Sequence, residues 1–282
     1  MPLVTTKEML NEAFEQGYGV GAFNAENMEM AQAIISAAEE CRAPVIVQTT
    51  PSTVKYADCG LYMANVRTLA ENASVPVAMH LDHGESFVLA IKALRAGYTS
   101  IMIDGSRANL EENIAISTAV AKACHAAGIP VEAELGKVGG KEDSLDNGDV
   151  DIYTDTEEAV EFTARTGIDF LAVGIGTAHG IYKGEPKLNL ERLAEIHAAV
   201  PVPLVLHGTS GVPDETVKAC IKLGISKINY ATDLRIAYTK GVREILRDNA
   251  VFDPKKYGKQ GREYVKRYVA AKMQVCGCCG KT

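Results

Sequence analysis

The sequence predicts a (β/α)₈ barrel, the TIM-barrel architecture of eight parallel strands and their connecting helices. Proline precedes a short aliphatic run four times, at Pro44, Pro76, Pro130 and Pro203. Proline is tolerated at the first residue of a strand but not in its middle, and runs that are apolar throughout are typical of parallel strands buried on both faces. Such runs alternate with segments of helical period, and their starts lie about 25 to 40 residues apart, which is the spacing of repeated strand–helix units.

The eight predicted strands follow one another along the whole chain. They are 19–24, 44–50, 76–83, 100–104, 130–136, 170–176, 203–208 and 227–232. Apolar residues at a spacing of three and four mark helices between them, for example over 31–38, 89–94 and 114–121. An open doubly wound sheet would normally carry a glycine-rich fingerprint after its first strand, and residues 19–24 do not match one. We therefore expect a closed barrel rather than an open sheet.

Two segments depart from the strand–helix repeat. Residues 137–154 form a polar, glycine-rich insertion after the fifth strand, which is either a mobile lid over the site or an ordinary surface loop. After the eighth strand, 233–248 and 261–274 have the pattern of two helices joined by a polar turn at Asp253-Pro254. We expect one barrel domain over 1–282, with 249–282 as a C-terminal extension that carries an extra helix.

Composition excludes several classes of protein. The chain has 282 residues, 47% of them hydrophobic and 23% charged, which describes an ordinary globular protein. A net charge of −7 without a basic block argues against nucleic-acid and anionic-membrane partners. No apolar stretch approaches 18 residues and the N-terminus lacks a signal-peptide pattern, so we expect a cytoplasmic protein. Most of the seven cysteines are scattered, and the Cys276–Cys279 tail lacks the second pair that a zinc site needs.

Polar residues gather where the predicted strands end, and in this fold the carboxyl ends of the strands meet around one mouth. Three of the six histidines, His83, His179 and His207, lie there on different strands, together with the carboxylates Asp104 and Glu134. Three histidines with an open position suit catalytic zinc. The sequence thus predicts a metal site at the mouth.

The other histidines have different interpretations. His125 and His197 fall in helical segments, and we expect them at the surface. His80 lies three residues before His83, so the two side chains leave opposite faces of the strand and should not share one ion. His80 shares a face with Asp82, and we expect His80 to support Asp82 from beneath.

The loops after the seventh and eighth strands predict a phosphate site, because such loops bind phosphate in many barrels. They contain Gly208-Thr209-Ser210-Gly211 and Asn229–Asp233, and Gly180 gives similar access after the sixth strand. Small residues let backbone N–H groups approach an anion, and a following helix N-terminus favours negative charge.

Five linked motifs follow one another along nearly the whole chain. They are His80-Leu81-Asp82-His83-Gly84, Ile101-Met102-Ile103-Asp104-Gly105-Ser106, Val131-Glu132-Ala133-Glu134-Leu135-Gly136, Gly176-Thr177-Ala178-His179-Gly180 and Leu204-Val205-Leu206-His207-Gly208. These motifs resemble those of the class II, zinc-dependent ketose-bisphosphate aldolases. Within that family the sequence is most similar to the tagatose-1,6-bisphosphate branch and next to the fructose-1,6-bisphosphate branch, on the stretches 171–173 and 222–225 and the tail 276–278.

The resemblance implies reversible cleavage of a ketose bisphosphate to dihydroxyacetone phosphate and glyceraldehyde 3-phosphate through a zinc-stabilised enediolate. It implies Zn²⁺ on His83, His179 and His207, with Asp104 and Glu134 at a second or alternative cation position. Asp82 would exchange the proton of the C4 hydroxyl, and Asn229 would donate a hydrogen bond to the enediolate. Glu142, in the lid-like loop, would move the proton on the dihydroxyacetone carbon. Substrate contacts are implied for Asn24, Gly180, Gly208, Thr209, Ser210, Asn229, Tyr230, Ala231 and Thr232.

Several points stay open in the sequence. Arg107 stands where members of the family usually have histidine, which puts the contacts of the Asp104 loop in doubt. The sequence does not choose between tagatose and fructose, which differ in one hydroxyl. The distal phosphate could be bound by Arg262, Lys266 or Arg267, either of this chain or of a neighbour, in an expected homodimer or homotetramer.

Other functions are weighed against this one. A Schiff-base aldolase needs a lysine at a strand end, and Lys227 lies at the wrong end of the eighth strand while Lys183 lies in a loop. A non-catalytic barrel subunit of an aldolase complex should lack some metal or proton-transfer residues, and all are present. A class II aldolase for a different phosphorylated ketose remains an alternative. A binuclear metallohydrolase would typically carry His-x-His on its first strand, where this chain has Phe23-Asn24.

Overall fold

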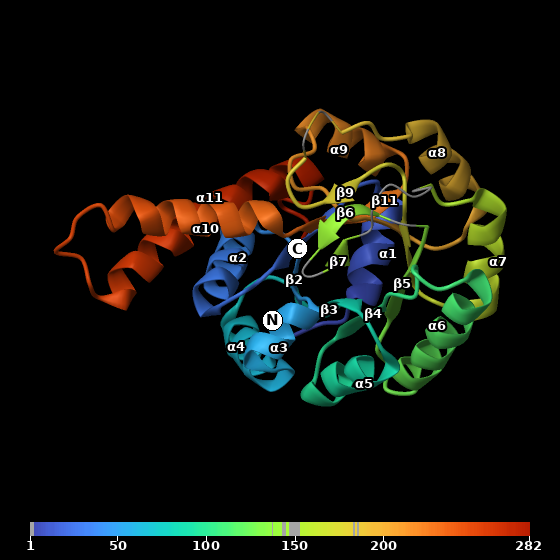
Figure 1. Ribbon diagram of the computed structural model, residues 1–282, viewed down its shortest axis with the longest axis horizontal. Coiled ribbons are helices and arrows are strands. Elements are labelled where there is room, and N and C mark those ends of the chain that lie inside the picture. The colour runs from blue at the N-terminus through green and yellow to red at the C-terminus, as the bar shows by residue number, and fades with distance from the viewer. Residues whose placement is uncertain (1–2, 137, 143–144, 147–152, 183, 185) are drawn as a thin grey trace.

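The computed structural model contains a closed barrel of eight parallel strands surrounded by helices (Figure 1), which confirms the predicted (β/α)₈ fold. The structure describes residues 3–136, 138–142, 145–146, 153–182, 184 and 186–282. Around the barrel the strands run in the order β1-β11-β10-β8-β5-β4-β3-β2. Their bounds are β1 Val20–Asn24, β2 Val45–Thr49, β3 Val77–Gly84, β4 Ser100–Ile103, β5 Val131–Leu135, β8 Phe170–Val173, β10 Leu204–Leu206 and β11 Ile225–Tyr230.

All eight predicted strands match within three residues at each end, and the eighth lies two residues earlier than predicted. We expected it over 227–232, but β11 begins at Ile225 and ends at Tyr230. Ala231 leaves the extended conformation with φ −128° and ψ −68°, and the next helix begins at Thr232. The predicted strand therefore includes the first residue of a helix, and the polar segment after Tyr230 is a helix N-terminus at the barrel mouth.

Helices α2 to α9 surround the barrel, whereas α1 lies across its centre in the view of Figure 1, and α10 and α11 extend away from it. In α2 the apolar stripe that predicted the helix, Ala31, Ile34, Ile35 and Ala38, is buried. The bounds are α1 Thr6–Gln16, α2 Met28–Cys41, α3 Pro51–Ala57, α4 Cys59–Asn72, α5 Phe87–Ala96, α6 Leu110–His125, α7 Thr156–Thr166, α8 Leu190–Ala199, α9 Asp214–Lys222, α10 Thr232–Ile245 and α11 Pro254–Cys276.

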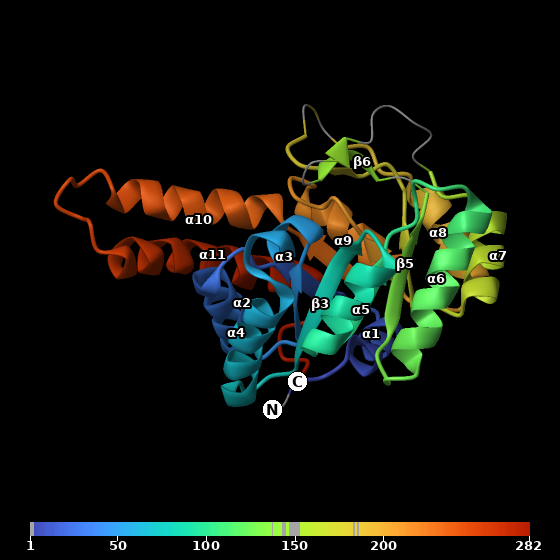
Figure 2. The ribbon, with the colours of Figure 1, turned by 60° about the horizontal axis from the view of Figure 1, so that its bottom comes forward.

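The C-terminal helix is longer than predicted. We expected it from 261, after a turn at Asp253-Pro254, but α11 begins at Pro254. Asp253 accepts a hydrogen bond from the N–H of Lys255, and proline is favourable in the first helical turn because the N–H it lacks would have no partner there. Asp253 and Pro254 therefore begin a helix rather than form a turn between two helices. Helices α10 and α11 lie side by side as a hairpin that projects from the barrel (Figure 2).

The cysteine tail packs as buried thiols. Cys276 and Cys278 are buried, and burial raises the pKa of Cys276 to about 12. Neither belongs to a cluster of potential metal ligands among the residues that the structure describes.

Part of the 137–154 insertion forms a small sheet at the mouth of the barrel (Figure 2). Strand β6 (Gly139–Glu142) pairs antiparallel with β7 (Leu145–Asp146) and parallel with β9 (Ala178–His179). Residues 137, 143–144 and 147–152 lie outside the described part of the chain, so a mobile lid remains a prediction.

Among the described helices, none combines the length and the apolar character that crossing a membrane would require.

Asp169 ties three elements together at the end of the barrel opposite the mouth. Its carboxylate accepts hydrogen bonds from the N–H of Val131 at 2.8 Å and from His125 Nε2 at 2.7 Å, and Lys7 Nζ lies 3.0 Å away. Burial alone would raise the pKa of Asp169, but these three partners outweigh it and hold the pKa below its usual value. The ionised carboxylate therefore stabilises the fold.

We expect Asp169→Asn to lower the free energy of unfolding at pH 7 by about 1–3 kcal/mol, the usual contribution of hydrogen bonds to a buried charged group. Because the folded pKa is depressed, this stabilisation is present above the unfolded pKa of about 3.9 and is lost as the pH falls through the folded pKa. Urea unfolding of both proteins between pH 7 and pH 3 should show the difference shrinking at acid pH. A difference that does not vary with pH would contradict this role.

Candidate active site

Three histidines from three elements converge at the mouth. His83 lies at the end of β3, His179 in β9, and His207 directly after β10. The ring centre of His83 is 4.6 Å from that of His207 and 5.0 Å from that of His179. One nitrogen of each ring lies within 4.8 Å of the others, and His83 Nε2 and His207 Nδ1 are 2.8 Å apart. The predicted histidine set is therefore brought together.

The backbone at His83 lets two consecutive residues face the site. Alternation along a strand would send Asp82 and His83 to opposite faces. His83 instead adopts a left-handed backbone with φ +49°, and the pairing of β3 with β4 is irregular between Leu81 and Gly84. Strained backbone of this kind costs free energy and occurs preferentially at functional sites. Both side chains consequently reach the mouth.

Two carboxylates flank the histidines. Asp104 Oδ2 lies 2.9 Å from His83 Nδ1, and its Oδ1 accepts hydrogen bonds from the N–H and the hydroxyl of Ser106. Burial alone would raise the pKa of Asp104, but the hydrogen bonds from His83 and Ser106 hold it well below its usual value. Glu134 Oε2 is 3.5 Å from His207 Nδ1. His83, Asp104 and Glu134 form a second group of potential metal ligands.

The donor set fits a zinc ion. Three imidazoles and nearby carboxylates are typical zinc ligands, and a site with three protein ligands leaves a position for substrate. Burial, reinforced by the neighbouring His83, lowers the pKa of His207. The neutral imidazole that this favours is the form that binds a metal.

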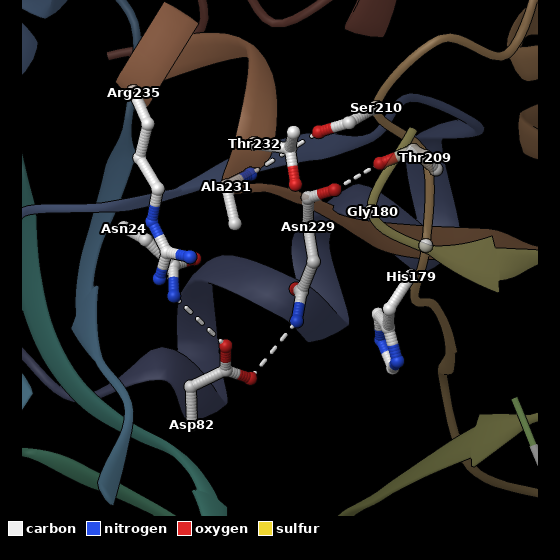
Figure 3. Close-up of a pocket in the computed structure, with 11 residues that line it drawn as sticks. Asn24, Asp82, His179, Gly180, Thr209, Ser210, Asn229, Ala231, Thr232 and Arg235 are labelled. Atoms are coloured by element: carbon white, nitrogen blue, oxygen red, sulfur yellow. Dashed lines mark hydrogen bonds between the residues drawn. The ribbon is translucent and has the colours of Figure 1, made fainter. Parts of the chain in front are cut away.

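Asp82 is held by three side-chain amides. Its Oδ2 accepts hydrogen bonds from Asn24 Nδ2 at 3.2 Å and Gln48 Nε2 at 3.1 Å, and its Oδ1 accepts one from Asn229 Nδ2 at 3.0 Å. Figure 3 shows Asn24 and Asn229 on either side of the carboxylate. Gln48 was not among the predicted site residues, although an amide directly after the apolar run Val45–Val47 in a buried strand was a usable signal.

A pocket adjoins Asp82 and His179 (Figure 3). The N-terminus of α10 faces it, and a helix N-terminus favours an anion. Arg235, which was not among the predicted site residues, also lines the pocket. Its guanidinium forms an ion pair with Glu26 at 2.6 Å. The lining residues are Asn24, Asp82, His179, Gly180, Gly208, Thr209, Ser210, Asn229, Ala231, Thr232 and Arg235.

The loop after β10 approaches neighbouring backbone too closely for a larger residue at Gly208. Its φ is +64°, and a Cβ there would lie 2.8 Å from the carbonyl group of Ala178. Thr209 donates a hydrogen bond to the carbonyl of Asn229, and Ser210 Oγ lies 3.4 Å from the backbone nitrogens of Ala231 and Asp233. The loop and the start of α10 therefore form one wall of the pocket.

Tyr230 does not line the pocket. It follows Asn229 on β11, so its side chain leaves the opposite face, where its ring is buried and stacks on Phe23 at 5.4 Å. Any contact of Tyr230 with a ligand is therefore limited to its backbone.

Two expectations about the remaining histidines need correction. We expected His80 to support Asp82 from beneath. His80 does lie beneath the site, but its Nδ1 forms a hydrogen bond with Ser100 at 2.7 Å, and the hydrogen bonds described above hold Asp82 through three amides instead. His197 is half-buried, with its ring 5.4 Å from that of Phe14 on α1. His125 is exposed, as predicted.

The three candidates for binding the distal phosphate, Arg262, Lys266 and Arg267, make their described contacts away from the pocket. Arg262 and Lys266 contact Gln32 and Glu40 of α2, on the outside of the barrel. Arg267 lies over the ring of Tyr264 on the same helix. Glu142 belongs to β6, and its side chain lies outside the described residues.

Comparisons with known proteins agree with this geometry. The profile of the family "Fructose-bisphosphate aldolase class-II" matches residues 4–281. A fructose-bisphosphate aldolase of Geobacillus stearothermophilus is 47% identical, over 100% of this chain and 99% of its own. One from Thermus caldophilus is also 47% identical, over 99% of both chains. The crystal structure of the YdjI aldolase from Escherichia coli K12 matches with a TM-score of 0.89 at 37% identity, covering 99% of both chains.

The expected likeness to the tagatose-bisphosphate branch stays a prediction, since the two curated relatives are named for fructose bisphosphate. The family itself is the one that the five sequence motifs indicated. A family match over nearly the whole chain, relatives of this identity and the shared barrel leave one conclusion: this chain is a lyase that belongs to the class-II fructose-bisphosphate aldolase family.

Proposed function

We propose that the enzyme reversibly cleaves a ketose 1,6-bisphosphate, tagatose or fructose, to dihydroxyacetone phosphate and glyceraldehyde 3-phosphate. The observation that carries this proposal is the joint placement of a histidine cluster, an amide-held carboxylate and a pocket at a helix N-terminus. Together they offer a metal position, a proton-transfer group and a phosphate site within one mouth. The names of the curated relatives support the same reaction class.

His83, His179 and His207 would hold the catalytic Zn²⁺, and Asp104 and Glu134 would hold a second or alternative cation, divalent or monovalent. Bound zinc supplies a Lewis acid that stabilises negative charge on substrate oxygens. The protein contributes the fixed directions of the three rings and the buried carboxylates beside them.

Asp82 would take the proton of the C4 hydroxyl in cleavage and return it in condensation. Its three amide donors fix the direction of the carboxylate without supplying a competing charge. Asn229 uses one N–H on Asp82, and its second N–H is the group that would donate to the developing enediolate. The same amide would thus connect the base and the reacting oxygen.

The phosphate of the dihydroxyacetone half would bind to backbone N–H groups of Gly180, of 208–210 and of 231–232. Small side chains and the N-terminus of α10 give an anion close access there. The Ser210 hydroxyl, which now lies near the backbone nitrogens of the helix start, would turn to the phosphate.

Glu142 is proposed to exchange the proton on the dihydroxyacetone carbon when the segment around β6 covers the mouth. The enzyme is proposed to act as a homodimer or homotetramer.

The protein would carry out this chemistry without a covalent enzyme adduct. Lys227 lies inside the barrel with its Nζ 2.9 Å from Glu132 Oε2, and an ammonium group paired with a carboxylate lacks the free electron pair that Schiff-base formation needs.

A coupled cleavage assay on fructose and tagatose 1,6-bisphosphates, run side by side, tests the function. Activity should disappear after chelation and return with Zn²⁺ or Co²⁺. Full activity in metal-free protein, checked by elemental analysis, would contradict the metal assignment. Trapping of substrate by borohydride would indicate a Schiff base instead.

Asp82→Ala should retain zinc and lose carbon–carbon cleavage by a factor of about 10²–10⁴, the usual effect of removing an acid–base group. The measurements are kcat, zinc content and the melting temperature of the purified variant. Turnover close to that of the wild type would remove Asp82 from proton transfer.

Gly208→Ala should raise KM for the bisphosphate at least about tenfold, because the new Cβ would displace the loop from Ala178 and misplace its N–H groups. Gly128→Ala is the matched control: Gly128 also has a positive φ, +72°, but no atom lies within 4 Å of the added Cβ. Both variants should lose about 1 kcal/mol of stability from backbone strain. Equal KM values in the two variants would contradict a role of this loop in phosphate binding.

A further inference from the structure

A second layer of polar and charged side chains lies beneath the residues of the mouth. On each of three strands a polar residue stands two positions before a site residue, and therefore on the same face and deeper in the barrel. All three deeper side chains are fully buried. The pairs are His80 and Asp82 on β3, Glu132 and Glu134 on β5, and Lys227 and Asn229 on β11.

Glu132 connects this layer to the metal-binding histidines. Its Oε1 lies 2.9 Å from His207 Nε2, the ring nitrogen that points away from His83. The opposite nitrogen, Nδ1, faces His83 Nε2 at 2.8 Å and Glu134 Oε2 at 3.5 Å. A carboxylate accepts but does not donate, so Nε2 would carry the proton when Nδ1 presents its lone pair to a metal at the site. Without a metal, one of the two nitrogens that face each other at 2.8 Å carries a proton.

Lys227 supplies the counter-charge for Glu132. Its Nζ lies 2.9 Å from Oε2 and 3.2 Å from Oε1, so that it bridges the carboxylate. His80 Nε2 lies 3.6 Å from the same carboxylate and 3.5 Å from Lys227 Nζ. His80 Nδ1 bonds to Ser100, which accepts a hydrogen bond from Thr6 at 2.8 Å. The network thus runs from α1 to His207.

Stability alone gives no reason for these charges. Replacing a buried ion pair by apolar residues of similar volume is often neutral or stabilising. A carboxylate on the outer nitrogen of a metal-binding histidine, by contrast, fixes the tautomer and the ring direction, and its loss typically costs 10–100-fold in metal affinity. Asp104 holds the outer nitrogen of His83 in the same way, at 2.9 Å.

We propose that Glu132, with Lys227 as its buried counter-charge, is the positioning residue of His207, and that this pair sets the affinity of the site for its divalent metal. The inference rests on the proposed zinc site and adds to it the residues that hold a ligand in its binding tautomer. Neither Glu132 nor Lys227 touches the substrate.

Metal affinity of the purified full chain tests the proposal, by competition of Zn²⁺ between the protein and a chromophoric chelator. Glu132→Gln with Lys227→Met removes both charges at nearly constant volume and avoids leaving one charge buried and alone. This double variant should fold with a melting temperature near that of the wild type and bind Zn²⁺ 10–100-fold more weakly. The absorption bands of its Co²⁺ form should shift, because the direction of one imidazole ligand has changed.

Asp169→Asn is the matched control, since Asp169 also joins a histidine to a lysine but lies at the opposite end of the barrel. It should lower the melting temperature and leave the affinity for Zn²⁺ and the Co²⁺ spectrum unchanged. Wild-type affinity in the double variant would overturn the inference while leaving the zinc site intact. Absence of zinc binding by the wild-type protein would instead refute the proposed function.

NMR of the wild-type protein keeps the test independent of how the variants fold. In protein labelled with ¹⁵N-histidine and loaded with Zn²⁺, His207 should carry its proton on Nε2, and the Nδ1 resonance should differ from that of the metal-free protein. A proton on Nδ1 in the zinc-loaded protein would overturn the proposal, whatever the variants show.

Discussion

The dry interior of the closed barrel is the constraint on which the rest of this structure depends. Every second residue of a strand points inward, where a charge without a partner would cost several kcal/mol. The partner of each buried charge must come from a different strand. Burial alone would raise the pKa of Glu132, yet Lys227 on β11 and His207, directly after β10, reverse the direction and hold the pKa below its usual value. Charge pairing across the barrel therefore allows its centre to hold Glu132 and Lys227.

The same pairing gives the histidines of the mouth their directions. His83 and His207 each have a carboxylate on the nitrogen that points away from the site, Asp104 in one case and Glu132 in the other. Their remaining nitrogens are left facing one another across 2.8 Å. The directions of these two rings are thus set by Asp104 and Glu132, which contact the outer nitrogens of the rings, as the proposed role of Glu132 requires.

Asp82 is supported by a different kind of contact. Its neighbours Asn24, Gln48 and Asn229 are neutral amides, which direct the carboxylate through hydrogen bonds without a formal counter-charge. Amide donors direct Asp82 for the proposed exchange of a proton, whereas the paired charges of Glu132 and Lys227 are proposed to hold His207 in one direction.

Local sequence determined the strands and their order along the chain, because proline positions and apolar runs are set by nearby residues. His83, His179 and His207 could be selected because they lie where predicted strands end, and Asp82 through the motif that it shares with the aldolase family. Tertiary structure decided the left-handed turn at His83, the role of Gln48 and the pairing of Glu132 with His207 and Lys227. Spacing along one strand fixes the face that a residue uses, but its partner depends on the register between strands far apart in the sequence. That register is set only when the barrel closes.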